Sequence, residues 1–385
     1  MNKVLFFLIF LLISSPVLGM HSVPRRKALP LGRPDASKLE EFRHLNFKYI
    51  KAVESGTIRD VSKCLEEGAN VNALNRFGRP ALLLAVLRKK SNVGIVCELL
   101  SRGAEVNAAT IDRKTALMFV AQNGNSKLAM VLLGRKDIHI NAQDSQGMTA
   151  LMYAVQNKNR DIVSLLLERK ADVNQINNLG QSALMIAVES GNIDIIAELI
   201  GMGKAPLNLP NRDGITPLMR AAEKGYADIV QWLIDNGVDI NDSHSSRFFE
   251  TPLMRAAKIG HSEMARLLIR KGAAVDISDS TGWTALMSSL DSGNIEMMKL
   301  LLDHEADVNA VGSGRTVLMW AVQDRKIDFV RLLLERGADV SAVAADGTTA
   351  LEIARRGGDS EIIELLQCYE TGVVLAGNDQ MDIER

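Results

Sequence analysis

The chain has 385 residues, of which 47% are hydrophobic, 24% charged and 4% aromatic. This composition is typical of a globular protein and unlike a disordered, collagen-like or coiled-coil chain. With 45 Lys and Arg against 46 Asp and Glu, it lacks the basic surplus of nucleic-acid-binding proteins, and we expect no nucleic-acid partner. Three cysteines exclude a disulfide scaffold.

Residues 1–19 have the layout of a secretory signal peptide. Lys3 supplies a positive charge, Val4 to Ile13 form an unbroken apolar run, and a small residue, Gly19, precedes the expected cleavage point. The run is too short to cross a bilayer, which takes about 20 apolar residues. We therefore predict an exported protein, periplasmic or secreted, without an integral membrane segment after cleavage. The alternative is an uncleaved interfacial anchor.

Residues 20–38 combine prolines with basic side chains, which indicates an extended, solvated linker. Contact of the basic cluster with anionic lipid or with a partner is the alternative. At the other end, residues 371–385 are polar and acidic, and we expect a flexible tail. The linker residues concerned are Pro24, Arg25, Arg26, Lys27, Pro30, Arg33 and Pro34.

A four-residue motif recurs between these ends. Successive copies are separated by 32 to 35 residues, and such a period indicates a solenoid of stacked units. One unit cannot bury its apolar face alone, so about ten copies are expected to form one array over residues 39–370. The motif begins at Pro80, Thr115, Thr149, Ser182, Thr216, Thr251, Thr284, Thr316 and Thr349, with a further copy placed at Phe47.

Each unit is predicted to contain two helices. The Thr or Ser that opens the motif suits a helix N-cap, and a Gly about nine residues later suits the end of that helix. A second helix follows, as the one-sided spacing of Ile162, Val163, Leu166 and Leu167 indicates. The end-of-helix glycines are Gly124, Gly191, Gly225, Gly260, Gly293 and Gly358, and a turn Gly stands two residues before most caps.

This unit resembles the ankyrin repeat, whose pattern is T-P-L-H-x-A-A-x-x-G with a closing G-A-D-V-N. The resemblance implies an all-α helix-turn-helix solenoid of about ten repeats with short β-turn fingers. It also implies that partners bind the turn tips and the concave face of the first helices. The sequence departs from the pattern at Arg113 and Phe249, where the turn Gly is lost, and at Lys89, Lys158 and Arg325, where the end-of-helix Gly is lost.

Met replaces the family's His in seven units, which raises the alternative of a metal-handling protein, because thioethers bind Cu(I). Neighbouring helices lie about 8–10 Å apart, too far for one Met per unit to close a shared site. We therefore expect core methionines. For Cys64 and Cys97 we expect buried free thiols, and a bond between them that staples the N-terminal end of the array is the alternative. No nucleotide loop, catalytic elbow or metal-binding His pair is present in the sequence, so we predict no enzyme activity, cofactor or metal.

One turn tip is longer than the others. Ten residues separate Asn241 from the cap at Thr251, against eight in most units, and this tip contains Phe248 and Phe249. We predict that this tip contributes to an exposed apolar ridge along the tips, which marks an interaction site. The alternative is that one Phe folds back over its turn. The other predicted ridge residues are Leu179, Ile215 and Trp283.

The first helices supply the remaining candidates for partner binding. Tyr153 and Trp320 directly follow the motif Met of their units, as do Arg220 and Arg255 of neighbouring units. The two arginines could grip an acidic group of a partner. The alternative is that they form ion pairs with Glu223 or Glu250.

Together these features predict a monomeric, exported, non-catalytic scaffold that binds a protein or peptide. A secreted effector that acts on a host or foreign protein is an alternative, and the metal-handling protein is another.

Overall fold

The computed structural model describes residues 36–88, 92–243 and 249–371. The predicted signal peptide, most of the predicted linker and the tail beyond Thr371 lie outside these residues. The chain divides into two compact units, Met1–Leu45 and Asn46–Arg385. The described part of the first unit is helical and belongs to α2 (Ala36–Ser55), so this helix begins inside the segment predicted as linker. No proline follows Pro34 there, and good helix formers do.

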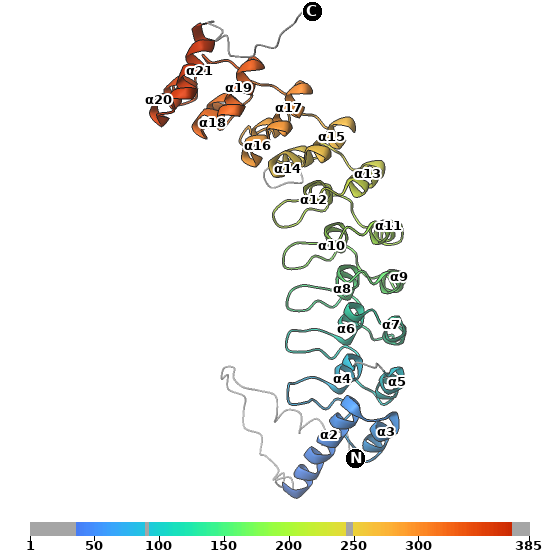
Figure 1. The fold of residues 1–385 in the computed structure, drawn as a ribbon. Coiled ribbons are helices and arrows are strands. Elements are labelled where there is room, and N and C mark those ends of the chain that lie inside the picture. The colour runs from blue at the N-terminus through green and yellow to red at the C-terminus, as the bar shows by residue number, and fades with distance from the viewer. Residues whose placement is uncertain (1–35, 89–91, 244–248, 372–385) are drawn as a thin grey trace, which may run out of the picture. The chain divides into compact units, whose positions relative to one another are not determined.

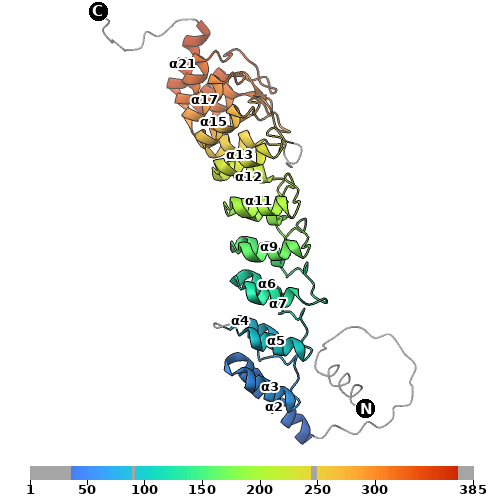
Figure 2. The ribbon, with the colours of Figure 1, turned by 90° about the vertical axis from the view of Figure 1, so that its right-hand side faces the viewer.

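The second unit consists of paired helices that stack in chain order (Figure 1). In each pair a first helix is followed by a second helix. Figure 2 views the stack from the side of the second helices. After α2 and α3 (Ile58–Glu66), the pairs are α4 (Ala81–Leu87) and α5 (Val93–Ser101), α6 (Ala116–Asn123) and α7 (Ser126–Leu133), α8 (Ala150–Gln156) and α9 (Arg160–Glu168), α10 (Ala183–Glu189) and α11 (Ile193–Gly201), α12 (Pro217–Lys224) and α13 (Ala227–Asp235), α14 (Pro252–Ile259) and α15 (Ser262–Arg270), α16 (Ala285–Ser292) and α17 (Ile295–Asp303), α18 (Val317–Gln323) and α19 (Ile327–Glu335), and α20 (Ala350–Gly357) and α21 (Ser360–Thr371).

The predicted N-caps are confirmed. Thr284 accepts a hydrogen bond at its Oγ1 from the backbone N–H of Met287 at 3.4 Å, three residues into α16. Such a bond satisfies one of the N–H groups that the first turn of a helix leaves without a partner. The same bond is present at Thr115, Thr149, Ser182, Thr216, Thr251, Thr316 and Thr349.

At the predicted ends of the first helices, one residue adopts the left-handed (αL) backbone conformation. Gly124 and Gly225 are two such residues. Where the Gly is lost, the backbone keeps the same conformation, with φ of 58° at Lys158 and 54° at Arg325. The turn positions Arg113 and Phe249 likewise have φ of 62° and 59°. The repeat therefore imposes this geometry whatever the side chain. Lys89 lies outside the described residues.

The core runs through the whole stack between first and second helices. All seven motif methionines are buried in it, so the methionines are core side chains. The sulfur of Met118 lies 3.4 Å from the N–H of Thr115, within the cap of its own helix. Cys64 and Cys97 are both free thiols, but only Cys64 is buried as expected, and the prediction of a buried Cys97 is wrong because its side chain is exposed.

Each pair is joined to the next through a finger, the turn that precedes a first helix. Asn72 accepts a hydrogen bond at Oδ1 from the N–H of Glu105 at 2.9 Å, and Asn107 does so from His139 at 2.8 Å. One finger contains a short antiparallel pair of strands, β1 (Val311–Gly312) and β2 (Arg315–Thr316). Five other fingers close with a single β-bridge between residues such as Leu74 and Pro80. The short β-turn fingers are thus present.

Candidate functional site

The first helices and the bases of the fingers form one continuous surface, named the first-helix face. Its two components are tied together by contacts between the residue before a cap and the residue eight positions later. Lys114 Nζ donates to Gln122 Oε1 at 2.9 Å, and Gln181 Nε2 donates to Glu189 Oε2 at 2.9 Å. Glu250 with Lys258, at 3.8 Å, and Arg315 with Gln323 repeat the arrangement. The fingers are therefore fixed on the helices that follow them.

Tyr153, a predicted partner-binding residue, is instead buried within the first-helix face. Its hydroxyl donates to Asp144 Oδ2 at 2.6 Å, and Lys114 Nζ lies 4.1 Å from the centroid of its ring. Burial and the neighbouring Asp144 carboxylate raise the pKa of Tyr153. Burial also lowers the pKa of Lys114. Because its polar and ring contacts are all internal, Tyr153 supports the finger rather than offering contact area.

Arg220 and Arg255 form ion pairs with acidic residues of the same face, as the alternative interpretation of the sequence held. Arg220 Nη1 lies 2.6 Å from Glu223 Oε2, and Arg255 Nη1 lies 3.0 Å from Glu223 Oε1. Arg220 Nε also lies 3.2 Å from Glu189, and Arg255 pairs with Glu250. The two guanidiniums are thus already engaged by three carboxylates from α10, α12 and the finger before α14.

Trp283 and Trp320 come from successive units and pack edge to face. Their ring centroids lie 5.3 Å apart at an interplanar angle of 63°. Trp320 Nε1 donates to the carbonyl of Gly312 at 3.1 Å, and the Arg315 guanidinium lies 5.5 Å from its ring centroid. Ser288 occupies the place on α16 that Trp320 occupies on α18, and it is small and buried. Both indoles remain half-buried, which leaves aromatic surface available.

The predicted ridge along the tips is wrong in one member. Ile215 is only 7% exposed, whereas Leu179 is 66% and Phe249 is 42% exposed. Ile215 directly precedes its cap, a position that faces the first helices, while Leu179 stands three residues before its cap and points outward. Leu179 lies in the turn itself and is followed by Gly180 with φ of 75°, whereas Ile215 comes after its turn, directly next to its cap. Phe248 lies outside the described residues.

Three exposed apolar side chains on the early fingers were not predicted. Leu74 and Phe77 lie on the finger before α4, and Ile111 lies on the finger before α6. For Phe77 and Ile111 the signal was present in the sequence, because most corresponding positions of other fingers hold polar residues or Gly.

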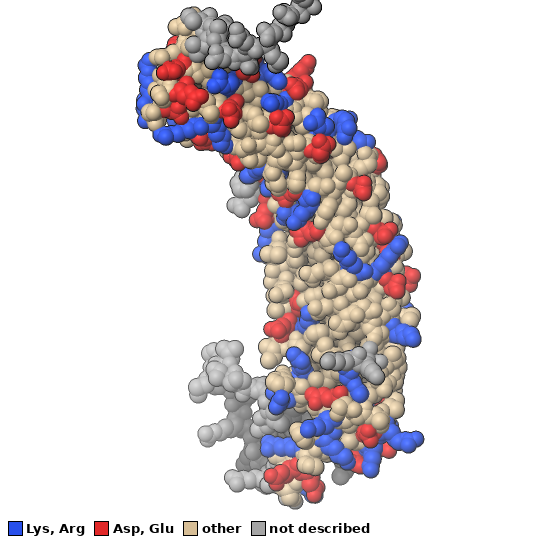
Figure 3. Space-filling view, viewed as in Figure 1, with Lys and Arg blue, Asp and Glu red and all other residues tan. Residues whose placement is uncertain are grey.

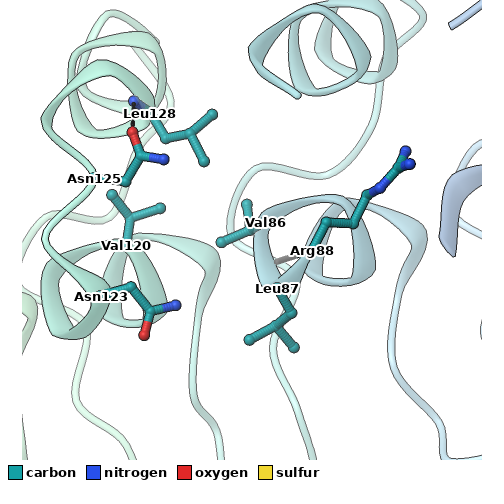
Figure 4. A pocket seen from close by; sticks show the side chains of 7 residues that line it. All are labelled: Val86, Leu87, Arg88, Val120, Asn123, Asn125 and Leu128. Atoms are coloured by element: carbon teal, nitrogen blue, oxygen red, sulfur yellow. Dashed lines mark hydrogen bonds between the residues drawn. The ribbon is translucent and has the colours of Figure 1, made fainter. Parts of the chain in front are cut away.

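A small pocket of about 260 Å³ lies between the ends of α4 and α6 (Figure 4). Arg88, Asn123 and Asn125 make its exposed surface mainly polar, and Asn125 accepts a hydrogen bond from the N–H of Leu128 at 3.1 Å there. Within the described ranges, no group of three or more His, Cys, Asp or Glu is placed to hold a metal ion. Over the same ranges, no helix has the length and apolar character needed to cross a membrane.

The comparison with family models returns ankyrin repeats. A model of three ankyrin repeats matches residues 85–177, 170–244, 242–311 and 310–375 in succession. Among curated proteins, none matches the chain significantly. The matched segments cover well over half of the chain and coincide with the stacked helix pairs, the fingers and the caps described above. The chain therefore belongs to the ankyrin-repeat family.

Proposed function

We propose that the protein is a non-catalytic scaffold that binds a segment of another protein on its first-helix face, between α14 and α18. Ankyrin repeats indicate a protein–protein interaction scaffold, and the family is generally non-enzymatic. The observation that carries the location is the half-buried Trp283–Trp320 pair, because such aromatic side chains dominate the binding energy of interfaces.

The neighbouring ion pairs support the proposal by setting the chemistry of the partner. Glu189, Glu223 and Glu250 balance Arg220, Arg255 and Lys258, so this stretch of the face is electrically neutral. Held by several carboxylates, the arginines need no reordering when a partner arrives, which lowers the entropic cost of binding. A segment with an aromatic or aliphatic side chain over the indoles and amide or hydroxyl groups over the ion pairs fits this surface.

The test replaces one indole at a time. Trp283→Ala and Trp320→Ala are expected to weaken capture of the partner about thirtyfold or more, the loss typical of a central interface residue. The chain offers a matched control, because its third tryptophan, Trp232, lies on the second helix α13, away from the first-helix face. Trp232→Ala should leave capture unchanged, and quantitative pull-down from cell extract with full-length protein measures all three.

Two outcomes would contradict this placement. One is that Trp283→Ala and Trp320→Ala both capture the partner as well as the unaltered protein does. The other is equal loss in all three variants with a lowered unfolding temperature, which would trace the effect to stability. The exposed Phe249, on the finger before α14, extends the proposed surface toward the fingertips, and Phe249→Ser tests that extension separately.

We also propose that the protein is exported, to the periplasm or the surrounding medium, on the basis of residues 1–19. Expression of the full-length chain followed by cell fractionation and intact-mass measurement tests this. Export with cleavage after Gly19 predicts the mass of residues 20–385 outside the cytoplasm. Recovery of uncleaved protein in the cytoplasm would contradict it.

A further inference from the structure

The fingers before α4 and α6 present large apolar side chains to solvent. Ile111 is 87% exposed, Phe77 60% and Leu74 59%. The two fingers are neighbours, because Asn72 at the base of the first accepts a hydrogen bond from the N–H of Glu105 at the base of the second. Figure 1 shows both loops projecting from the same side of the first helices. These side chains therefore stand on protruding tips and not in a groove.

Three basic side chains lie beside the apolar residues, together with one exposed carboxylate, Asp112. Arg76, Arg79 and Arg113 belong to the same two fingers and are exposed. The guanidinium of Arg76 lies 4.6 Å from the centroid of the Phe77 ring. Among the described residues, no carboxylate lies within ion-pair distance of these three arginines, whereas Arg220 and Arg255 on the first-helix face are each paired twice.

Basic residues also outnumber acidic ones over the whole early part of the array. Residues 46–114 contain 12 Lys and Arg against seven Asp and Glu, whereas residues 115–371 contain 25 against 33. The array thus carries a net charge of +5 in its early part and −8 in the remainder, although the whole chain is almost neutral. Figure 3 shows Lys and Arg at this end of the array, with Asp and Glu side chains among them. Any anionic surface would attract this part of the array first.

We propose that the fingers before α4 and α6 dock on the surface of an anionic lipid bilayer. Protruding apolar tips need a medium that can deform around them, and the boundary between headgroups and acyl chains is such a medium. The arginines beside the tips would then lie at the level of the lipid phosphates, where they bind bidentately. A protein partner would instead need a preformed pocket for Ile111.

The experiment measures sedimentation of the full-length protein with vesicles of phosphatidylcholine alone and of an equal mixture of phosphatidylcholine and phosphatidylglycerol. The anionic vesicles are expected to bind more protein, and salt is expected to weaken binding. Replacing Arg76, Arg79 and Arg113 with Gln should lower the partition coefficient about a hundredfold, since each basic side chain contributes about fivefold. Replacing Leu74, Phe77 and Ile111 with Ser should lower it at least tenfold.

The finger before α10 supplies the matched control. Ile176 and Leu179 are exposed apolar residues there, and residues 175–182 contain no charged side chain. Replacing both with Ser should leave vesicle binding unchanged. All variants share residues 1–35, so any difference between them comes from the fingers. Equal binding to both kinds of vesicle, or equal binding by all variants, would overturn the proposal. So would loss of a captured protein, without loss of vesicle binding, in the Leu74, Phe77 and Ile111 variant.

Discussion

The hydroxyl of Tyr153 and the carboxylate of Asp144 form a 2.6 Å hydrogen bond that links a first helix to its own finger. Asp144 is 6% exposed, and its other oxygen accepts the N–H groups of Gln146 and Met148 at 2.9 Å each. One buried carboxylate therefore holds both the turn and the helix after it. Since α8 lies near the middle of the array, this bond is expected to contribute to the stability of the whole stack.

Tyr153→Phe should destabilise the protein by about 1–3 kcal/mol, because it leaves one oxygen of a buried carboxylate without its donor. Urea unfolding followed by circular dichroism measures this change. Tyr226→Phe is the control, since Tyr226 is half-buried and its hydroxyl makes no hydrogen bond with the described residues. Equal effects of the two substitutions would count against the role given to the Asp144 contact.

The raised pKa of Tyr153 predicts a dependence of stability on alkaline pH. The folded protein holds the phenolic proton more tightly than the unfolded chain, in which Tyr has its ordinary pKa of about 10. The stabilisation is therefore complete below about pH 10 and declines as the pH rises above that value. Unfolding at a series of pH values should show a shallower decline for Tyr153→Phe. Identical slopes for the variant and the unaltered protein would refute the prediction.

Lys158→Gly should stabilise the protein by about 0.5–1 kcal/mol. Lys158 has φ of 58°, a region that costs an L-residue about 1 kcal/mol or more and Gly almost nothing. Thermal unfolding measures the gain. Gly124→Lys places the same side chain at the equivalent residue of the preceding unit, where φ is 75°, and should lower stability. A loss of stability in Lys158→Gly would show that its side chain matters more than its backbone.

Glu223→Gln should destabilise the array by about 1–3 kcal/mol, because two guanidiniums share this nearly buried carboxylate. The expected loss of stability is modest because each arginine retains a second carboxylate, Glu189 for Arg220 and Glu250 for Arg255. Glu263→Gln removes the charge from an exposed pair with Arg266 at 3.7 Å and should change stability little. Chemical unfolding of both variants at low and high salt compares them, and equal small effects would contradict the prediction.

The repeat, its helices, its caps and its left-handed positions could all be predicted from the order of residues along the chain. These features depend on residues close together in the chain, such as Thr284 and Met287, and on backbone angles that a Gly or an N-cap residue signals directly. Ten imperfect copies of one local pattern make each of them recognisable even where a single copy has lost a residue, as at Lys158.

Only the tertiary structure decided which side chains remain available to a partner. Ile215 and Leu179 are both apolar finger residues, but Ile215 is buried next to its cap and Leu179 is exposed in the turn of its own finger. Arg255 pairs with Glu223, 32 residues earlier, and Trp320 packs on Trp283 of the preceding unit. Such contacts join units through their stacking, and the distance between two side chains in neighbouring units is not encoded in either local pattern.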